Sequence, residues 1–195
     1  MKNIVTSFLA LFTLAAAAKS PVAVEWRGAG ETFPAAVARP FAGFLSDGSF
    51  LIAGGSNFEN GEKVYLADVS VRAPDGTWKK IGALPRGVAE GVACETPKGI
   101  FCGGGTDGKS KFVEAFLLSA SRAASEPYHL EQLPDLPEPV AMGAAACEGS
   151  TVYVVGPKKV YCLDLGRARC PQRAEDGGLG TDRPTSDNCD WQLIA

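Results

Sequence analysis

The chain has 195 residues, a formal net charge of −3 at neutral pH and 46% hydrophobic residues. This composition is typical of a globular protein with a buried core, and it excludes a predominantly disordered chain. Basic residues are not in excess and form no stripe along the sequence, so we expect no binding to nucleic acid.

Residues 1–18 have the features of a secretory signal peptide. Lys2 precedes an almost wholly apolar run from Ile4 to Ala18, and the small residues 16–18 suit cleavage by a signal peptidase. The run is shorter than the roughly 20 residues that a membrane span needs. We therefore expect a periplasmic or secreted protein with no membrane span after signal cleavage.

Residues 21–165 contain a repeated unit of strands. An apolar strand that ends in a glycine pair occurs at 49–55, returns at 99–104 and returns in weaker form at 151–156. Each copy follows a small-residue strand, at 43–45, 91–95 and 143–148, and precedes a polar loop and an aromatic-bearing strand, at 64–71, 111–118 and 159–165. Outer strands are predicted at 77–81 and 128–133. A period near fifty residues built from strands predicts an all-β, kelch-type propeller.

The repeat boundaries give about three blades. Leu84-Pro85 and Leu136-Pro137 mark the exits of the first two units, and the third unit begins at Glu138 without a recognisable fourth strand. Residues 166–195, which include a Gly/Asp-rich stretch at 175–190, are predicted to be a poorly ordered tail. Propellers close with about four to eight blades. The chain is therefore expected to be part of a longer protein, or to self-associate through its open propeller edges.

The six cysteines are expected mainly as compact core residues. Cys94 and Cys147 are predicted to occupy equivalent positions on the small-residue strands. A bridge between Cys94 and Cys102 on neighbouring strands is the alternative. Cys170 and Cys189 lie in the predicted tail, and no spacing of cysteine and histidine suggests a zinc site.

Two strings of residues resemble a known family. The first is residues 53–58 followed by residues 61–65 and Asp68, and the second runs from Leu84-Pro85 through residues 91–93 to residues 103–109. Both resemble the kelch-repeat, cyclically permuted mutarotase family, which includes sialic acid mutarotases. The resemblance implies a six-bladed propeller that interconverts the anomers of N-acetylneuraminate, a small-molecule sugar acid, with no cofactor and no metal.

Mutarotation needs a group that takes the proton of the anomeric hydroxyl and a group that serves the ring oxygen. Glu90, four residues after Arg86, is the candidate acid/base residue. Arg39 and Arg86 are predicted at equivalent blade entries and are the candidates for binding the substrate carboxylate, because a guanidinium pairs with both oxygens. Each of these three residues can also be read as an ordinary charge on the propeller rim.

The loops after the glycine pairs supply the remaining candidates. Asn57 could bind sugar hydroxyls or hold a tight turn. Phe58 could stack on a sugar or anchor its loop by packing inward. Lys63 and Asp107 are weaker candidates for substrate binding and can also be solvated loop charges. His129, the only histidine, is predicted on an outer strand away from the axis.

The repeat pattern also fits a non-catalytic kelch module that binds a protein or a glycan through the same rim. That alternative requires no acid/base pair. A copper enzyme of the galactose oxidase type is more remote, because the sequence has a single histidine.

Overall fold

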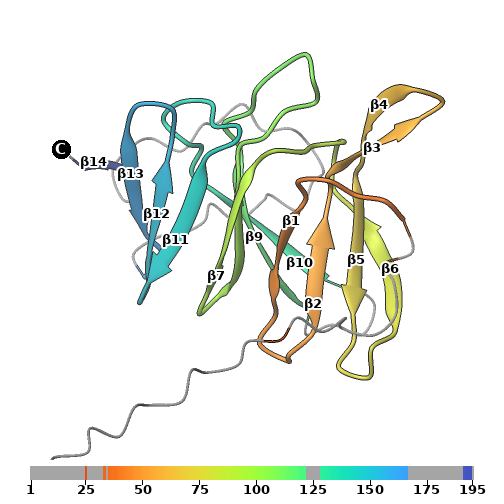
Figure 1. The fold of residues 1–195 in the computed structure, drawn as a ribbon. Coiled ribbons are helices and arrows are strands. Elements are labelled where there is room, and N and C mark those ends of the chain that lie inside the picture. The colour runs from red at the N-terminus through yellow and green to blue at the C-terminus, as the bar shows by residue number, and fades with distance from the viewer. Residues whose placement is uncertain (1–24, 26–32, 34, 122–127, 167–190, 195) are drawn as a thin grey trace, which may run out of the picture.

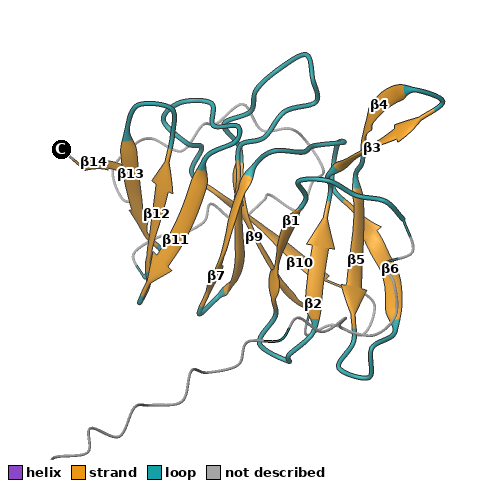
Figure 2. Ribbon diagram, viewed as in Figure 1, coloured by secondary structure: helices purple, strands orange, loops and turns teal. Residues whose placement is uncertain are grey.

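The computed structural model describes residues 25, 33, 35–121, 128–166 and 191–194. These residues form strands, turns and loops (Figure 2). Among them, no helix is long and apolar enough to cross a membrane. The predicted signal peptide, Cys170 and Cys189 lie outside the described residues.

Three four-stranded antiparallel sheets stand side by side (Figure 1). Blade 1 has the order β1 (Phe41–Phe44), β2 (Phe50–Ala53), β5 (Asp68–Arg72) and β6 (Trp78–Ala83). Blade 2 consists of β7 (Val92–Thr96), β8 (Gly99–Gly103), β9 (Ala115–Ala120) and β10 (Tyr128–Leu133). Blade 3 consists of β11 (Ala144–Glu148), β12 (Thr151–Val155), β13 (Val160–Asp164) and β14 (Gln192–Ile194). These are the all-β meander blades that the repeat predicts.

The third strand of each of the first two blades is shorter than predicted. The sequence pattern assigns one strand to 64–71 and one to 111–118, but β5 begins at Asp68 and β9 begins at Ala115. The residues before these points belong to rim loops: residues 62–65 form β4, and Lys111 makes a single bridge with Thr106. Residues 64–65 and 111–112 therefore lie outside the four-stranded sheets, although the Phe112 ring still packs against the buried cluster between blades 1 and 2.

A hairpin stands where the sequence predicts a polar loop. β3 (Ser56–Glu59) pairs with β4 (Glu62–Tyr65), and the two connecting residues, Asn60 and Gly61, have φ of 52° and 84°. Two left-handed residues of the Asn-Gly type are the preferred connection of a two-residue hairpin. The hairpin projects from the rim beyond blade 1 (Figure 1).

The third blade has four strands, where the sequence predicts an unfinished unit. β14 pairs with β13, with Tyr161 opposite Leu193, and Trp191 packs against the core between blades 2 and 3. The indole Nε1 donates a hydrogen bond to the Pro134 carbonyl oxygen at 3.1 Å. Trp191 thus takes the outer-strand aromatic position. Residues 167–190 lie outside the described residues.

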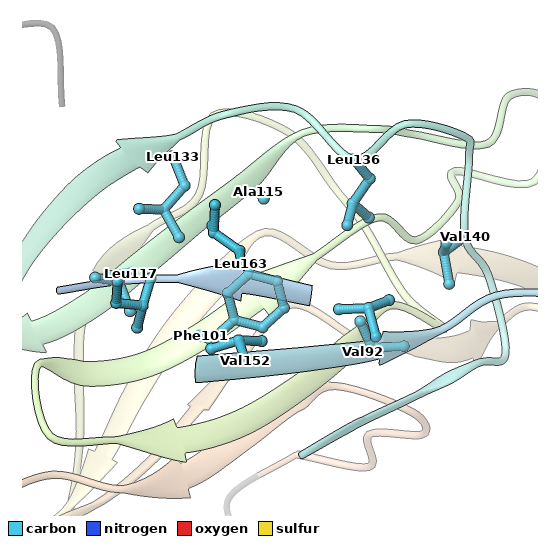
Figure 3. Close-up of a cluster of buried hydrophobic side chains, with 11 residues drawn as sticks. Val92, Phe101, Ala115, Leu117, Leu133, Leu136, Val140, Val152 and Leu163 are labelled. Carbon is cyan, nitrogen blue, oxygen red and sulfur yellow. The ribbon is translucent and has the colours of Figure 1, made fainter. Parts of the chain in front are cut away.

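The core lies between the blades rather than within them. One buried cluster joins blade 1 to blade 2 and includes Leu51 and Leu118, while a second joins blade 2 to blade 3 and includes Phe101 and Val152 (Figure 3). In the middle blade three successive residues of β8, 100–102, are fully buried because both faces of the sheet are covered. In β12 of blade 3 burial alternates, with Val152 fully buried and Val155 44% exposed.

The glycine pair is the joint between consecutive blades. Gly105 has φ of 101°, and its N–H donates to the Val140 carbonyl oxygen of the next blade entry at 2.7 Å; Gly55 N–H donates to Val88 in the same way. A β-carbon on Gly104, whose φ is 64°, would collide with the Val140 carbonyl oxygen. Only glycine combines this left-handed backbone with so close an approach.

Candidate functional site

Three residues with left-handed backbone line the inner ends of the blade entries. Arg39, Glu90 and Met142 have φ of 52°, 65° and 60°. Each lies two residues before the first strand of its blade, which is the strand that pairs with the glycine-pair strand. The Glu90 N–H donates to the Arg39 carbonyl oxygen at 3.0 Å, and the Met142 N–H donates to the Glu90 carbonyl oxygen at 2.7 Å. The backbone therefore places these three side chains in a row from blade to blade.

This row corrects the predicted equivalence of Arg39 and Arg86. The counterpart of Arg39 in blade 2 is Glu90, and in blade 3 it is Met142. Left-handed φ is uncommon for residues with a β-carbon and marks positions that the surrounding structure holds in place. The repeated unfavourable backbone identifies this row as the centre of the candidate site.

Glu90 lies between two cations. Its Oε1 atom accepts a hydrogen bond from Lys63 Nζ at 2.9 Å and lies 3.2 Å from Arg39 Nη1. The Glu90 side chain is 12% exposed, while the side chains of Arg39 and Lys63 are 59% and 35% exposed. We call these three residues the Glu90 cluster. Its carboxylate is turned inward and its cationic groups reach solvent.

The contacts within the Glu90 cluster shift two pKa values. The hydrogen bond from Lys63, followed by the charges of Lys63 and Arg39, lowers the pKa of Glu90 despite the opposing effect of burial. The hydrogen bond to Glu90, followed by one with Tyr65, raises the pKa of Lys63. Glu90 is thus a carboxylate and Lys63 an ammonium across the physiological range.

The β3–β4 hairpin brings Lys63 to the cluster. Lys63 Nζ also lies 4.9 Å from the centroid of the Tyr65 ring, a cation–π distance. The Tyr65 ring in turn packs on the backbone of blade 2, where a β-carbon on Gly108 would lie 2.8 Å from its hydroxyl. The hairpin is therefore fixed to the second-unit loop, and Lys63 is held over the blade entry.

Asn57 and Phe58 lie on the same hairpin. The Asn57 side chain carries a buried Oδ1 with no hydrogen-bond partner among the described residues, and its Nδ2 lies 3.5 Å from Glu59. A buried acceptor without a donor is unusual. Phe58 is 75% exposed, so the reading of this ring as an inward-packed anchor is wrong.

Arg86 and Asp107 have other partners. Arg86 Nη2 lies 2.9 Å from Glu114 Oε1, and its guanidinium stacks 4.7 Å above the Phe112 ring, beside a small cavity of about 110 Å³. The Asp107 carboxylate accepts the backbone N–H groups of Ser110 and then Lys109, which lower its pKa. The structure thus joins Arg39, Lys63 and Glu90, and it engages Arg86 and Asp107 elsewhere.

Sequence reasoning left out Met142 and Tyr65. The Met142 side chain is 66% exposed, and its sulfur accepts a hydrogen bond from Arg39 Nη1 at 3.1 Å. The recurring alanine before Arg39, Glu90 and Met142 is the signal that could have aligned the three positions. His129 lies on the outer strand β10, as predicted.

The cysteine predictions require two corrections. Cys94 pairs with Phe101 across β7 and β8, while Cys102 pairs with Ala93, so the Cys94 and Cys102 side chains lie on opposite faces of blade 2. Both are free thiols, so the alternative of a bridge between them is wrong. Cys94 and Cys147 are also not equivalent, because Cys94 is the third residue of its β7 strand and Cys147 is the fourth of β11.

Within the described ranges, no group of three or more His, Cys, Asp or Glu side chains is placed to hold a metal ion. The Glu90 cluster can instead bind an anionic group through its two exposed cations. It can also present a carboxylate to a proton donor such as a hydroxyl group.

The meander blades, glycine-pair joints and converging rim loops define a kelch-type β-propeller array. The solved structure of YjhT matches 85% of this chain with a TM-score of 0.61 and 14% sequence identity. At 14% sequence identity, this structural similarity shows that the two chains share a fold. The chain covers 54% of the length of the YjhT structure. No family model matches the sequence, and no curated protein matches it.

Proposed function

We propose that the chain forms part of a sugar-acid mutarotase that interconverts the anomers of N-acetylneuraminate, with the Glu90 cluster as its catalytic and carboxylate-binding site. The observation that carries the proposal is the placement of one inward carboxylate between two solvent-facing cations at the propeller rim. A sugar acid has a carboxylate for the cations and an anomeric hydroxyl for Glu90. The family resemblance of residues 53–68 supports the same substrate class.

In the proposed reaction, the carboxylate of the sugar pairs with Arg39, whose guanidinium is the most exposed charge of the cluster. Glu90 takes the proton of the anomeric hydroxyl while the bond between the anomeric carbon and the ring oxygen breaks. Lys63 donates a hydrogen bond to the ring oxygen and stabilises its developing charge, and that oxygen takes up a proton from solvent water, whose hydroxide is neutralised by the proton that Glu90 holds. Closure on the other face of the carbonyl reverses these steps and returns the proton.

The hairpin supplies the remaining contacts of the proposed site. The exposed Phe58 ring lies opposite Lys63 on the same face of the hairpin and covers an apolar face of the sugar. Asn57 lies opposite Val64 on the other face and its Oδ1 is buried, so Asn57 is left outside the proposed site. Arg86 and Asp107 are left outside the proposed site because Glu114 and the local turn already engage them.

One observation favours the non-catalytic alternative. The lowered pKa of Glu90 makes this carboxylate a weaker base than an ordinary glutamate. A module that only binds an anionic glycan would use Arg39 and Lys63 and would keep Glu90 to position them. Rate and binding measurements separate the two functions.

The test follows anomer exchange of N-acetylneuraminate by NMR with the full chain. We expect faster exchange than in buffer, a loss of about 100-fold or more of this acceleration in Glu90→Gln, and near-normal rates in the control Glu114→Gln. Broadening of the sugar signals without acceleration would support the binding module. Absence of both effects would refute the sugar-acid assignment.

A further inference from the structure

We propose that Cys94 and Cys147 form a disulfide that links blade 2 to blade 3 when the protein meets an oxidising thiol–disulfide environment. The inference is independent of the proposed activity. It rests on the position of the two thiols in the repeat, on the face of the blade that each occupies and on the close approach of the equivalent positions in blades 1 and 2.

The two cysteines face each other across one blade interface. Cys94 pairs with Phe101 and Cys147 pairs with Val152. Both partners belong to the buried cluster between blades 2 and 3, and both cysteines pack against that cluster. The Cys94 side chain on the innermost strand of blade 2 therefore faces blade 3, and the Cys147 side chain on the innermost strand of blade 3 faces blade 2.

The interface between blades 1 and 2 gives the spacing of this pair of positions. β1, β7 and β11 occupy the same place in their blades and can be aligned at their first residues. One blade earlier, the counterpart of Cys94 is then Gly43 and the counterpart of Cys147 is Glu95. A β-carbon on Gly43 would lie 3.2 Å from Glu95 Cγ. Glu95 also reaches across, since its Oε1 accepts a hydrogen bond from the Phe44 N–H at 2.7 Å.

A cysteine sulfur occupies the γ position of its side chain. Repetition of the blade geometry thus puts the Cys94 β-carbon near the Cys147 sulfur at a comparable spacing. Across a disulfide, the distance from one β-carbon to the opposite sulfur is about 3 Å, as follows from an S–S bond of about 2.05 Å. The two innermost strands bring the thiols together at the spacing that a disulfide requires.

The other described cysteines do not share this interface. Cys102 is fully buried in the cluster between blades 1 and 2, on the opposite face of blade 2. Cys162 pairs with Tyr153, on the face of blade 3 that points away from blade 2. In the structure Cys94 and Cys147 are free thiols, so the reduced form is the one described.

The reaction is a thiol–disulfide exchange with a small disulfide such as oxidised glutathione. The thiolate of one cysteine attacks a glutathione sulfur, the glutathione S–S bond breaks, and one glutathione thiol leaves. The second cysteine then attacks the mixed disulfide, forms the bond between the protein sulfurs and releases the second glutathione thiol. The protein loses two protons and two electrons, and the glutathione disulfide gains them.

Burial makes this exchange slow at neutral pH. Burial, followed by the neighbouring Cys147, raises the pKa of Cys94 to about 12, and burial also raises the pKa of Cys147. Because the thiolate is the attacking form, formation of the bond accelerates as the pH rises. The contribution of Cys147 to the raised pKa of Cys94 is a second sign that the two thiols are neighbours.

The test uses the full chain with Cys170→Ser and Cys189→Ser, which removes the two cysteines outside the described residues. After oxidation by glutathione disulfide at pH 7 and pH 9, peptide mapping by mass spectrometry should give one crosslinked peptide that contains Cys94 and Cys147. Non-reducing electrophoresis should show a monomer. The crosslink should be absent from Cys94→Ser and Cys147→Ser and retained in the matched control Cys162→Ser.

A second measurement keeps the inference testable if a serine variant folds poorly. The bond would close a loop of about fifty residues, and we expect the oxidised chain to melt roughly 10 °C above the chain reduced with dithiothreitol. A crosslink of Cys94 to Cys102, a crosslink between two chains, or full alkylation of both thiols after oxidation would each overturn the inference.

Discussion

At the scale of single residues, the candidate site is organised by backbone conformation as much as by charge. Arg39, Glu90 and Met142 share a left-handed φ that is unfavourable for each of them. The hydrogen bonds between neighbouring members of the row hold this conformation in place. Three different side chains at one structural position imply that the backbone is repeated while the chemistry of each blade entry differs.

The ion pair of Lys63 and Glu90 should make stability depend on pH. The pKa of Glu90 is lowered on folding, so its contribution is present above the ordinary pKa of glutamate, near 4.3, and is lost as the pH falls through the folded value. The pKa of Lys63 is raised, so its contribution is present below the ordinary pKa of lysine and is lost as the pH rises through the folded value. We expect Glu90→Gln to lower the free energy of unfolding at pH 7 and to have a smaller effect at pH 3, measured by urea unfolding.

Asp68→Asn provides the control for this experiment. Asp68 lies 2.7 Å from Lys80, but the two side chains are 53% and 60% exposed, and such surface pairs contribute little. Its effect should be close to zero at both pH values. An equal loss from Glu90→Gln at pH 3 and pH 7 would mean that the ion pair does not account for the stabilisation.

At this scale the sequence indicated three residues that the structure brings together, but it did not indicate every position of the row. It selected Glu90, Arg39 and Lys63, which the fold brings together from segments up to 51 residues apart. It took Arg86 as the counterpart of Arg39, whereas the counterpart is Glu90. Both are charged residues that follow the blade exit at Leu84-Pro85, so the sequence does not distinguish them. The left-handed φ that distinguishes them is a property of the folded backbone.

At the scale of elements, the strands inside the blades are the most predictable part of the fold. β10 coincides with the outer strand predicted at 128–133, and β12 (Thr151–Val155) covers all but the last residue of the glycine-pair strand predicted at 151–156. The β3–β4 hairpin was missed, although Asn60-Gly61 is a strong hairpin signal, because the flanking residues lack an alternating apolar pattern. A one-residue error in aligning Cys147 reversed its face, since side chains alternate along a strand.

The glycine-pair joint should tolerate no side chain. Gly104→Ala would combine a left-handed backbone with a collision against the Val140 carbonyl oxygen, and we expect a loss of about 2–4 kcal/mol in the free energy of unfolding. Gly48→Ala is the matched control, because Gly48 has φ of 82° with nothing within 4 Å of an added β-carbon. Its cost should be near 1 kcal/mol. Equal losses in the two variants would exclude the close approach at the joint as a cause.

The weakening of the third repeat has a structural counterpart at this joint. Gly156 corresponds to Gly104, since its N–H likewise donates to the following strand segment, at Lys159. The next residue is Pro157, in place of Gly105, whose N–H reaches the following blade entry. Proline has no N–H to donate. Blade 3 therefore cannot repeat the backbone joint that connects blades 1, 2 and 3.

At the scale of the whole molecule, the described blades are unequal because, within the part of the chain that the structure describes, only blade 2 has another blade packed on each face. The fully buried run at 100–102 belongs to blade 2, whereas β2 and β12 are buried on alternate residues. Stability is therefore concentrated in the two interfaces between blades, as in other repeat proteins. Among the described residues, no further blade packs on the outer faces of blades 1 and 3.

Self-association should proceed through the aromatic outer face of blade 1. Phe44 is 56% exposed on that face and stacks on Phe50, with ring centroids 4.9 Å apart, while Phe50 lies 6.5 Å from Trp78 and Trp78 lies 4.6 Å from Phe33. Burial of such aromatic surface is a strong drive for association. We expect sedimentation velocity to show oligomers that increase with concentration, and Phe44→Ser to shift the distribution toward the monomer.

Phe58→Ser is the matched control for the role of the blade face. Phe58 is 75% exposed, more than Phe44, but it lies on the β3–β4 hairpin at the rim. If exposed aromatic area alone drove association, this variant would be at least as effective as Phe44→Ser. If the uncovered blade face drives it, Phe58→Ser should leave the oligomer distribution unchanged, because a rim hairpin cannot supply the flat sheet surface on which another blade packs. A monomer at all concentrations in the unmodified chain would contradict association through the open edge.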